Sequence, residues 1–358
     1  MATLYNIYGK EIYHSNGTVE QAFLEAVKQG VDLTAIDCEG MNLPNQNITG
    51  AKLFMAKLRG GNFTGTVWDD CDLRQADMQK SDCSYGKFTA CNIEATFLNN
   101  SQLQSVTFEN CHSHLLQVQG CNLIGSVWTG VRHGNFIDFS FSNLSKSDFR
   151  NTSLLDPDFG HSKIDGVKMP AKIERGYISY LQSAKGVDWS GSFVKQTQLN
   201  GSHFEEIKAQ GLVLNECEGT DLSFSEGQLE AMTMDGKFTG LKLSNSNLSR
   251  SRFEGVFEQS ALKGTNLSGA SSTGANFMNS IFESVVTDGA QFPMSKLQGS
   301  IHIKTSWLNA NLNMSEVFRT EFHDSPINPE SHLVSRPLDA DIAQAETKAA
   351  SKNNLLTR

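Results

Sequence analysis

The sequence predicts a solenoid, a fold made by stacking many short copies of one structural unit. Large apolar side chains recur at every fifth residue, as in the stretch MNLPNQNITGAKLFMAKLRGGNF (residues 41–63). From Leu33 to His133, every fifth position except Ser113 and His133 is apolar. A helix repeats near 3.6 residues and a strand at 2, so a period of five fits neither element alone. The frame shifts by one residue near 134–144 and then continues, which indicates one repeat architecture for most of the chain.

A second regularity accompanies the first. Two positions before each apolar centre lies a mostly small residue, and Asn or Asp often lies between them. The segments CDLRQADMQK (71–80), GTNLSGASSTGANF (264–277) and LNANLN (308–313) show this clearly. The pattern resembles the pentapeptide-repeat family, whose units read roughly Ala-Asp/Asn-Leu-x-x. The resemblance implies an all-β fold, a right-handed quadrilateral β-helix in which each pentapeptide forms one side and four make a coil.

If a coil holds about 20 residues, positions separated by one coil stack on the same internal face. Five large side chains have this spacing and should form a core ladder: Ile48, Trp68, Phe88, Phe108 and Trp128. Cys71, Cys91 and Cys111 have the same spacing at the small inward position. Because neighbouring coils pair at strand spacing, ~14 coils would make a rod roughly 70 Å long.

The ends depart from the repeat and divide the chain into three predicted parts. Residues 1–30 predict a cap, with a hairpin turning at Gly9-Lys10 and a helix that begins at its N-cap Thr18 and stops at Gly30. Residues 31–325 form the predicted β-helix. Residues 326–358 predict a tail, in which DADIAQAETKAAS (339–351) could form a short helix and could mediate self-association.

One interior segment, residues 170–187, breaks the period and predicts an irregular coil or a short helical excursion. Met169 and Trp189 share one frame across the break, so the break occupies the space of one coil. Exposed side chains on such a break would be contact candidates, and we single out Arg175, Tyr177 and Tyr180. The alternative is that the tyrosines pack into the core of a distorted coil.

The motifs that could carry chemistry are few. Cys111, His112 and His114 suggest a metal site by composition, but the repeat points the cysteine inward and both histidines outward, so the three cannot converge. A surface histidine pair could still bind metal weakly. Asp156 and Asp158 beside His161 could be an acid/base cluster, but a solvated polar corner is favoured. We therefore predict no catalytic residues, no metal site and no cofactor.

The composition of the chain limits the kinds of partner that it is expected to bind. The formal net charge is −9, from 30 basic and 39 acidic residues, which argues against direct nucleic-acid binding. No apolar run suggests a membrane span, and no signal peptide is evident, so we expect a cytoplasmic protein.

The predicted function is non-enzymatic binding of a protein partner through the surface of the rod. One alternative is a structural or assembly component, for example of a viral particle, with the ends docking. Another follows from the resemblance, since some family members mimic DNA and bind type II topoisomerases. Residues 31–325 carry 32 acidic and 24 basic side chains, but the basic residues are scattered among the acidic ones.

Overall fold

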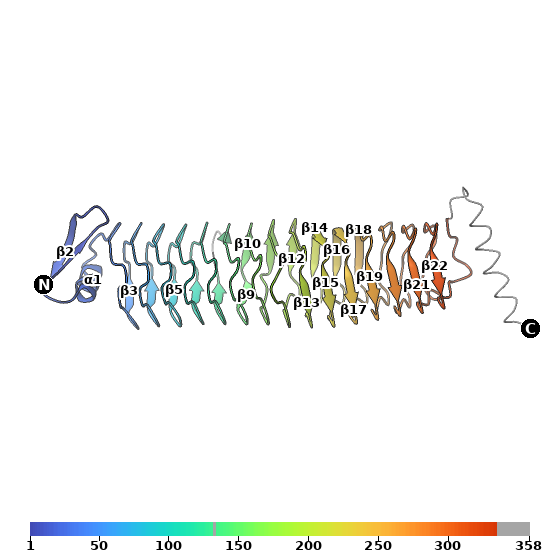
Figure 1. Cartoon of the computed structure of the whole chain (residues 1–358), viewed down its shortest axis with the longest axis horizontal. Helices are drawn as coiled ribbons and strands as arrows, with labels where there is room; N and C mark the ends of the chain where they lie inside the picture. The colour runs from blue at the N-terminus through green and yellow to red at the C-terminus, as the bar shows by residue number, and fades with distance from the viewer. Residues whose placement is uncertain (132–133, 335–358) are drawn as a thin grey trace, which may run out of the picture. The chain divides into compact units, whose positions relative to one another are not determined.

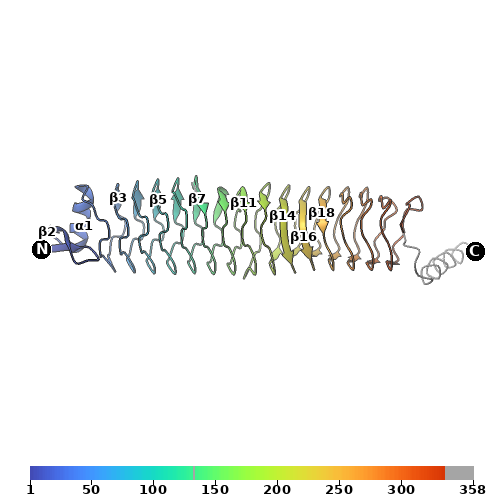
Figure 2. The ribbon, with the colours of Figure 1, turned by 90° about the horizontal axis from the view of Figure 1, so that it is seen from above.

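The structure is a computed structural model that describes residues 1–131 and 134–334. The chain divides into two compact units, Met1–Glu218 and Gly219–Arg358. Each unit is a stack of coils whose short strands lie side by side (Figure 1), and the turned view shows the same stacking (Figure 2). The predicted right-handed quadrilateral β-helix with a hairpin-helix cap is confirmed.

The first unit begins with the cap. Strands β1 (Ala2–Tyr5) and β2 (Glu11–Ser15) pair antiparallel around a turn in which Gly9 has a φ of 74°. Helix α1 (Val19–Lys28) begins at a capping box, because the Thr18 hydroxyl accepts from the Gln21 N–H and the Gln21 side chain accepts from the Thr18 N–H. The helix buries Phe23 and two alanines against the cap, as its amphipathic pattern requires.

A single corner explains the period of five. The Ala56 N–H donates to the Leu53 carbonyl at 3.0 Å, and Met55 between them has a φ of 59°. This is the geometry of a type II turn, which bends the chain by one corner. On either side of the buried Leu53, the backbone pairs in parallel with the next coil, where Lys52 faces Asp72. Four such corners complete one coil and return the chain to the same face.

One face of the first unit is a parallel sheet in the order β3-β4-β5-β6-β7-β9. We call it the tryptophan face, because Ile48, Trp68, Phe88, Phe108 and Trp128 pair in register along it. Its strands are β3 (Asn47–Thr49), β4 (Val67–Asp69), β5 (Lys87–Thr89), β6 (Thr107–Glu109), β7 (Val127–Thr129) and β9 (Asp148–Asn151).

The frame shift is absorbed within one coil. Phe97 pairs with Gln117 at the regular spacing of 20 residues, whereas Gln117 pairs with Asp138, one residue later than that spacing would place it. The ring of Trp128 still stacks on Phe149 with 5.5 Å between centroids. The remaining strands that begin in this unit are β8 (Gly134–Asn135), β10 (Ser153–Leu155), β11 (Lys172–Glu174), β12 (Phe193–Lys195), β13 (His203–Glu205) and β14 (Val213–Thr220).

Residues 170–187 form a complete coil without a helical excursion. Strand β11 pairs with β10 and β12, while Ser183 and Lys185 pair with neighbouring coils. The segment buries four inward apolar side chains and also Leu181: Ile173, Ile178, Ala184 and Val187. The break in the sequence period therefore comes from local shifts of one residue within an otherwise paired coil.

The second unit repeats the same construction. Strands β15 (Ser223–Ser225), β17 (Lys242–Ser244), β19 (Ala261–Lys263), β20 (Ile281–Glu283), β21 (Ile301–Ile303) and β22 (Glu321–His323) pair in parallel in this order. On another face, β16 (Thr233–Thr239) pairs with β18 (Arg252–Val256). Backbone pairing reaches Val334, beyond the expected end of the repeat at residue 325. The helix considered at 339–351 lies outside the described residues.

Candidate binding surface

Three aromatic side chains stack on the outside of consecutive coils in the first unit. Phe141 lies on His161 with 4.9 Å between ring centroids, and His161 lies on Tyr180 with 5.7 Å, each pair being within 12° of parallel. Phe141 is 55% exposed and Tyr180 is 50% exposed. We call these three residues the corner stack. Tyr180 belongs to the predicted contact candidates, whereas the sequence analysis did not select Phe141.

The corner stack occupies a left-handed backbone position that recurs at the corners of the solenoid and that Tyr85 and Phe136 also occupy. Phe141, His161 and Tyr180 have φ values of 60°, 56° and 56°, a conformation that favours glycine. Such a conformation costs a non-glycine residue about 1 kcal/mol. Gly201 lies at the equivalent corner of the coil after Tyr180, and an added Cβ there would come within 2.7 Å of the Tyr180 ring. What distinguishes these three corners is that their rings stack on one another at exposed or half-buried positions.

Two aspartates lie beside the corner stack on the same side of the coil. Asp138 and Asp158 pair on consecutive coils and accept from the N–H groups of Ser140 and Gly160. Burial raises the pKa of Asp158 and the neighbouring Asp138 carboxylate adds to this, whereas the hydrogen bond from the Gly160 N–H acts in the opposite direction. Within the described part of the chain, neither aspartate forms an ion pair. We call Asp138 and Asp158 the aspartate pair.

The other two predicted contacts are less available than Tyr180. Arg175 is exposed, but its guanidinium binds the Asp156 carboxylate through two hydrogen bonds of 2.8 and 2.6 Å. Tyr177 is half-buried, and its ring covers Gly160, where an added Cβ would come within 2.6 Å of it. Tyr177 therefore supports the aspartate pair from the next coil, whereas the Arg175 charge is neutralised.

Apolar side chains also line the preceding corner. Leu115 is 42% exposed and Phe136 is 48% exposed, and the edge of the His114 ring contacts Phe136 with 5.8 Å between centroids. The aspartate pair therefore lies between the corner stack and a corner that carries Phe136 and, one coil later, Asp156. An apolar patch with a charged strip through it is typical of a surface for macromolecular contact.

The acid/base cluster considered from the sequence is not free to act as one. Asp156 is held by Arg175, Asp158 is half-buried beneath Tyr177, and His161 lies between two rings. These three groups are therefore occupied by structural contacts.

The predicted core residues lie inside. The Trp68, Phe88, Phe108 and Trp128 rings stack in sequence, with centroid separations of 6.1, 5.0 and 4.2 Å. The thiols of Cys71, Cys91 and Cys111 contact the carbonyls of Ile48, Trp68 and Phe88, at 3.3 to 3.4 Å. All of these side chains are buried, so they act in packing.

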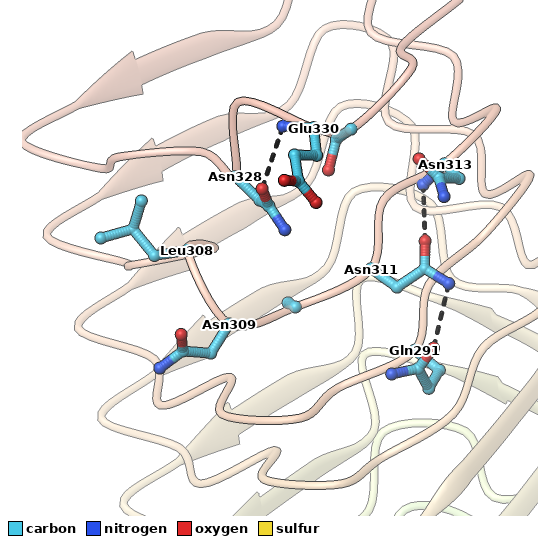
Figure 3. A pocket seen from close by; sticks show the side chains of 9 residues that line it. Gln291, Leu308, Asn309, Asn311, Asn313, Asn328 and Glu330 are labelled. Carbon is cyan, nitrogen blue, oxygen red and sulfur yellow. Dashed lines mark hydrogen bonds between the residues drawn. The ribbon is translucent and has the colours of Figure 1, made fainter.

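A polar recess of about 430 Å³ lies in the second unit (Figure 3). Its amide groups bond to one another, since Asn311 donates to Gln291 and accepts from the Asn313 N–H. The Asn328 side chain accepts from the Glu330 N–H in the same way. These amides already have partners, so the recess offers less to a ligand than the exposed corner stack.

Acidic and basic side chains alternate between coils elsewhere in the first unit. Lys87 binds Glu109 at 2.6 Å, and Lys185 binds Glu205 and Glu206 at 2.9 Å. Asp148 binds both Arg150 and Lys168. The negative charge is therefore interrupted by cations along the coil faces.

The sequence profile described as pentapeptide repeats matches residues 29–65, 56–94 and 135–169, with eight copies of the repeat. These segments of the chain are therefore pentapeptide repeats. A search of curated protein sequences found no match. In the described residues, no helix is long and apolar enough to cross a membrane.

Several solved structures are similar. Trypsin-treated QnrB1, a plasmid-mediated fluoroquinolone resistance protein, is 15% identical over 55% of this chain and 95% of its own, with a TM-score of 0.23. HetL, involved in heterocyst differentiation regulation in Nostoc sp. strain PCC 7120, is 15% identical over 84% and 98%, with a TM-score of 0.15. Rfr23 from Cyanothece 51142 is 16% identical over 35% and 90%, with a TM-score of 0.19.

Proposed function

We propose that this chain is a non-enzymatic binding protein that holds a protein partner on the outside of its first unit. The contact surface comprises the corner stack, the aspartate pair, and the apolar side chains of Leu115 and Phe136. The observation that carries the proposal is the corner stack itself: three aromatic side chains, two of them about half exposed, stack face to face on the outside of consecutive coils.

The arrangement of the rings defines what they can bind. Because the three rings lie face to face, they present their edges to the outside as an apolar ridge. With coils about 4.8 Å apart, three rings span roughly 10 Å. A stable interface buries about 800 Å² on each partner. The partner must therefore also cover the aspartate pair and the preceding corner.

The carboxylates of Asp138 and Asp158 form no ion pair among the described residues, and they favour a partner with basic side chains at the matching place. An arginine or lysine can lay its aliphatic stem along the ring edges and reach a carboxylate with its charged end. Such a contact weakens as salt is added, because part of it is exposed. The alternation of cations with acids on neighbouring coils speaks against a DNA-mimicking surface, which would need continuous negative charge.

Recovery of partners from an extract of the source cells tests the proposal. The full chain is immobilised beside the double variant Phe141→Gly, Tyr180→Gly and the control Tyr85→Gly. Tyr85 is 62% exposed with a φ of 59° but lies outside the corner stack, so it matches the change without touching the surface. We expect a protein set recovered by the wild type and the control, and lost with the double variant. Equal recovery by all three chains would contradict the proposal.

A further inference from the structure

The polar recess of the second unit lies beside a shortened last coil (Figure 3). Trp307 pairs with Ile327, 20 residues later, whereas Glu316 pairs with Val334, only 18 residues later. The chain is therefore two residues shorter here than in the coil before it. It crosses this stretch in a tight turn over residues 328–331, whose first carbonyl accepts from the last N–H at 3.0 Å. The recess of about 430 Å³ lies between this turn and the side chains of the preceding coil.

The side chains of the recess keep hydrogen-bonding groups for a ligand, although its amides also bond within the fold. The Asn328 side-chain oxygen accepts from the Glu330 N–H at 3.0 Å, and its two amide hydrogens have no partner among the described residues. The Asn309 amide donates to Asp288 at 3.1 Å, so its oxygen stays available. Within the described part of the chain, the Glu330 carboxylate takes part in no hydrogen bond or ion pair. Figure 3 shows Asn328 and Glu330 together on one wall, with Asn309 across from them.

The internal bonds of the recess hold its amides in fixed orientations. Asn311 donates to Gln291 at 3.0 Å and accepts from the Asn313 N–H at 2.9 Å. The Asn313 side-chain oxygen accepts in turn from the His332 N–H at 3.0 Å. Side chains that are already ordered lose less conformational entropy when a ligand binds. The bonds between these residues therefore prepare the recess for a small polar ligand.

The lining determines the chemistry of that ligand. Among the described residues that line the recess, Glu330 is the one ionisable side chain, so a phosphate or carboxylate ligand would meet a negative charge and no cation. Amide hydrogens donate and a carboxylate accepts, which suits hydroxyl groups because a hydroxyl does both. Leu308, which is 46% exposed, adds an apolar wall. The volume lies within the roughly 300–1,000 Å³ of small-molecule sites.

We propose that this recess binds a neutral hexose sugar. The Glu330 carboxylate accepts from two neighbouring hydroxyls, the Asn328 amide donates to a further oxygen, and Leu308 packs against the C–H groups of the ring. Because most of the lining is exposed, we expect a dissociation constant of about 1 mM. The sugar site lies in the second unit and does not rest on the proposed protein-binding function.

Saturation-transfer NMR of the full chain with glucose, galactose and mannose tests the proposal. We expect saturable binding of at least one of these sugars to the wild type. In Glu330→Ala and in Glu330→Gln the dissociation constant should rise about tenfold, because a charge-assisted hydrogen bond is lost. Glu226→Ala is the matched control, since Glu226 is exposed in the same unit and does not line the recess. Its dissociation constant should equal that of the wild type.

The uronate of the sugar that binds, with a carboxylate in place of the hydroxymethyl group, should bind more weakly because Glu330 repels it. Absence of saturable binding of all three neutral sugars up to about 20 mM would overturn the site. An unchanged dissociation constant in both Glu330 variants, or a uronate that binds as tightly as the neutral sugar, would also overturn it. Both variants should melt like the wild type, because Glu330 is exposed.

Discussion

Trp68 and Phe88 lie in consecutive coils with their ring planes 6° apart and their centroids separated by 6.1 Å. Phe88 in turn stacks on Phe108 at 5.0 Å, and none of the three side chains is exposed. Each ring therefore packs against the coil before it and the coil after it. Stability in such a stack depends on contacts between neighbours, so a defect in one ring should affect several coils.

Phe88→Asp should unfold the coils around it. The substitution removes buried aromatic area, a loss of about 3–5 kcal/mol for a full truncation, and adds a charge without a partner. Hydrogen exchange measured by mass spectrometry should show lost protection on both sides of residue 88. Phe97→Asp is the control, because Phe97 is 37% exposed on the outside, and its protection should stay near that of the wild type. Wild-type protection in Phe88→Asp would contradict the role of the ladder.

His302 should make the second unit sensitive to acid. Its ring is fully buried between Phe282 and Phe322, with centroids 4.7 and 4.6 Å away. The Trp307 Nε1–H donates to His302 Nδ1 at 3.1 Å, so His302 Nε2–H donates to the Ser300 hydroxyl at 2.9 Å. Burial lowers the pKa of His302 to about 3, so the folded protein keeps this ring neutral.

Proton linkage determines how the stability of the folded protein changes with pH. Because the folded pKa lies below the unfolded value of about 6.5, the unfolded chain binds the proton more readily, and stability is lost as the pH falls below about 6.5. The expected loss is about 2 kcal/mol at pH 5. Denaturant titrations of the wild type and His302→Gln between pH 5 and 7 measure it. The variant should lose this part of the slope, and equal slopes would contradict the prediction.

All seven cysteines are buried and should resist thiol reagents in the folded protein. Burial raises the pKa of Cys38 and of Cys121 to about 12, which keeps both thiols protonated and unreactive near neutral pH. A colorimetric thiol assay should find almost no fast reaction before denaturant is added and reaction of all seven thiols afterwards. Rapid reaction of the native chain would show that the coils open.

The sequence predicts the core well, because the inward side chains recur at a fixed spacing. Inward side chains recur at every fifth position and stack once per coil, so the Trp68–Phe88 contact follows from spacing alone. The corner stack does not follow in this way. The step from Phe141 to His161 has the regular length of a coil, but the step from His161 to Tyr180 is one residue shorter, because the coil containing Tyr180 has shifted.

Outward positions are also less constrained than inward ones, so the repeat pattern says little about them. The break in the period predicts both Tyr180 and Arg175 as contact residues. Only Tyr180 is available, because Arg175 binds Asp156.

The thermal stability of Phe141→Gly, Tyr180→Gly tests the central claim that the corner stack serves binding and not folding. Glycine relieves the left-handed backbone, worth about 1 kcal/mol per residue, but gives up ring stacking of about 0.5–1.5 kcal/mol and adds unfolded-state entropy. These terms nearly cancel, so we predict a free energy of unfolding within about 1 kcal/mol of the wild type per substitution. A loss of about 3 kcal/mol or more per substitution, as for a core ring, would contradict the claim and make the stack a structural element.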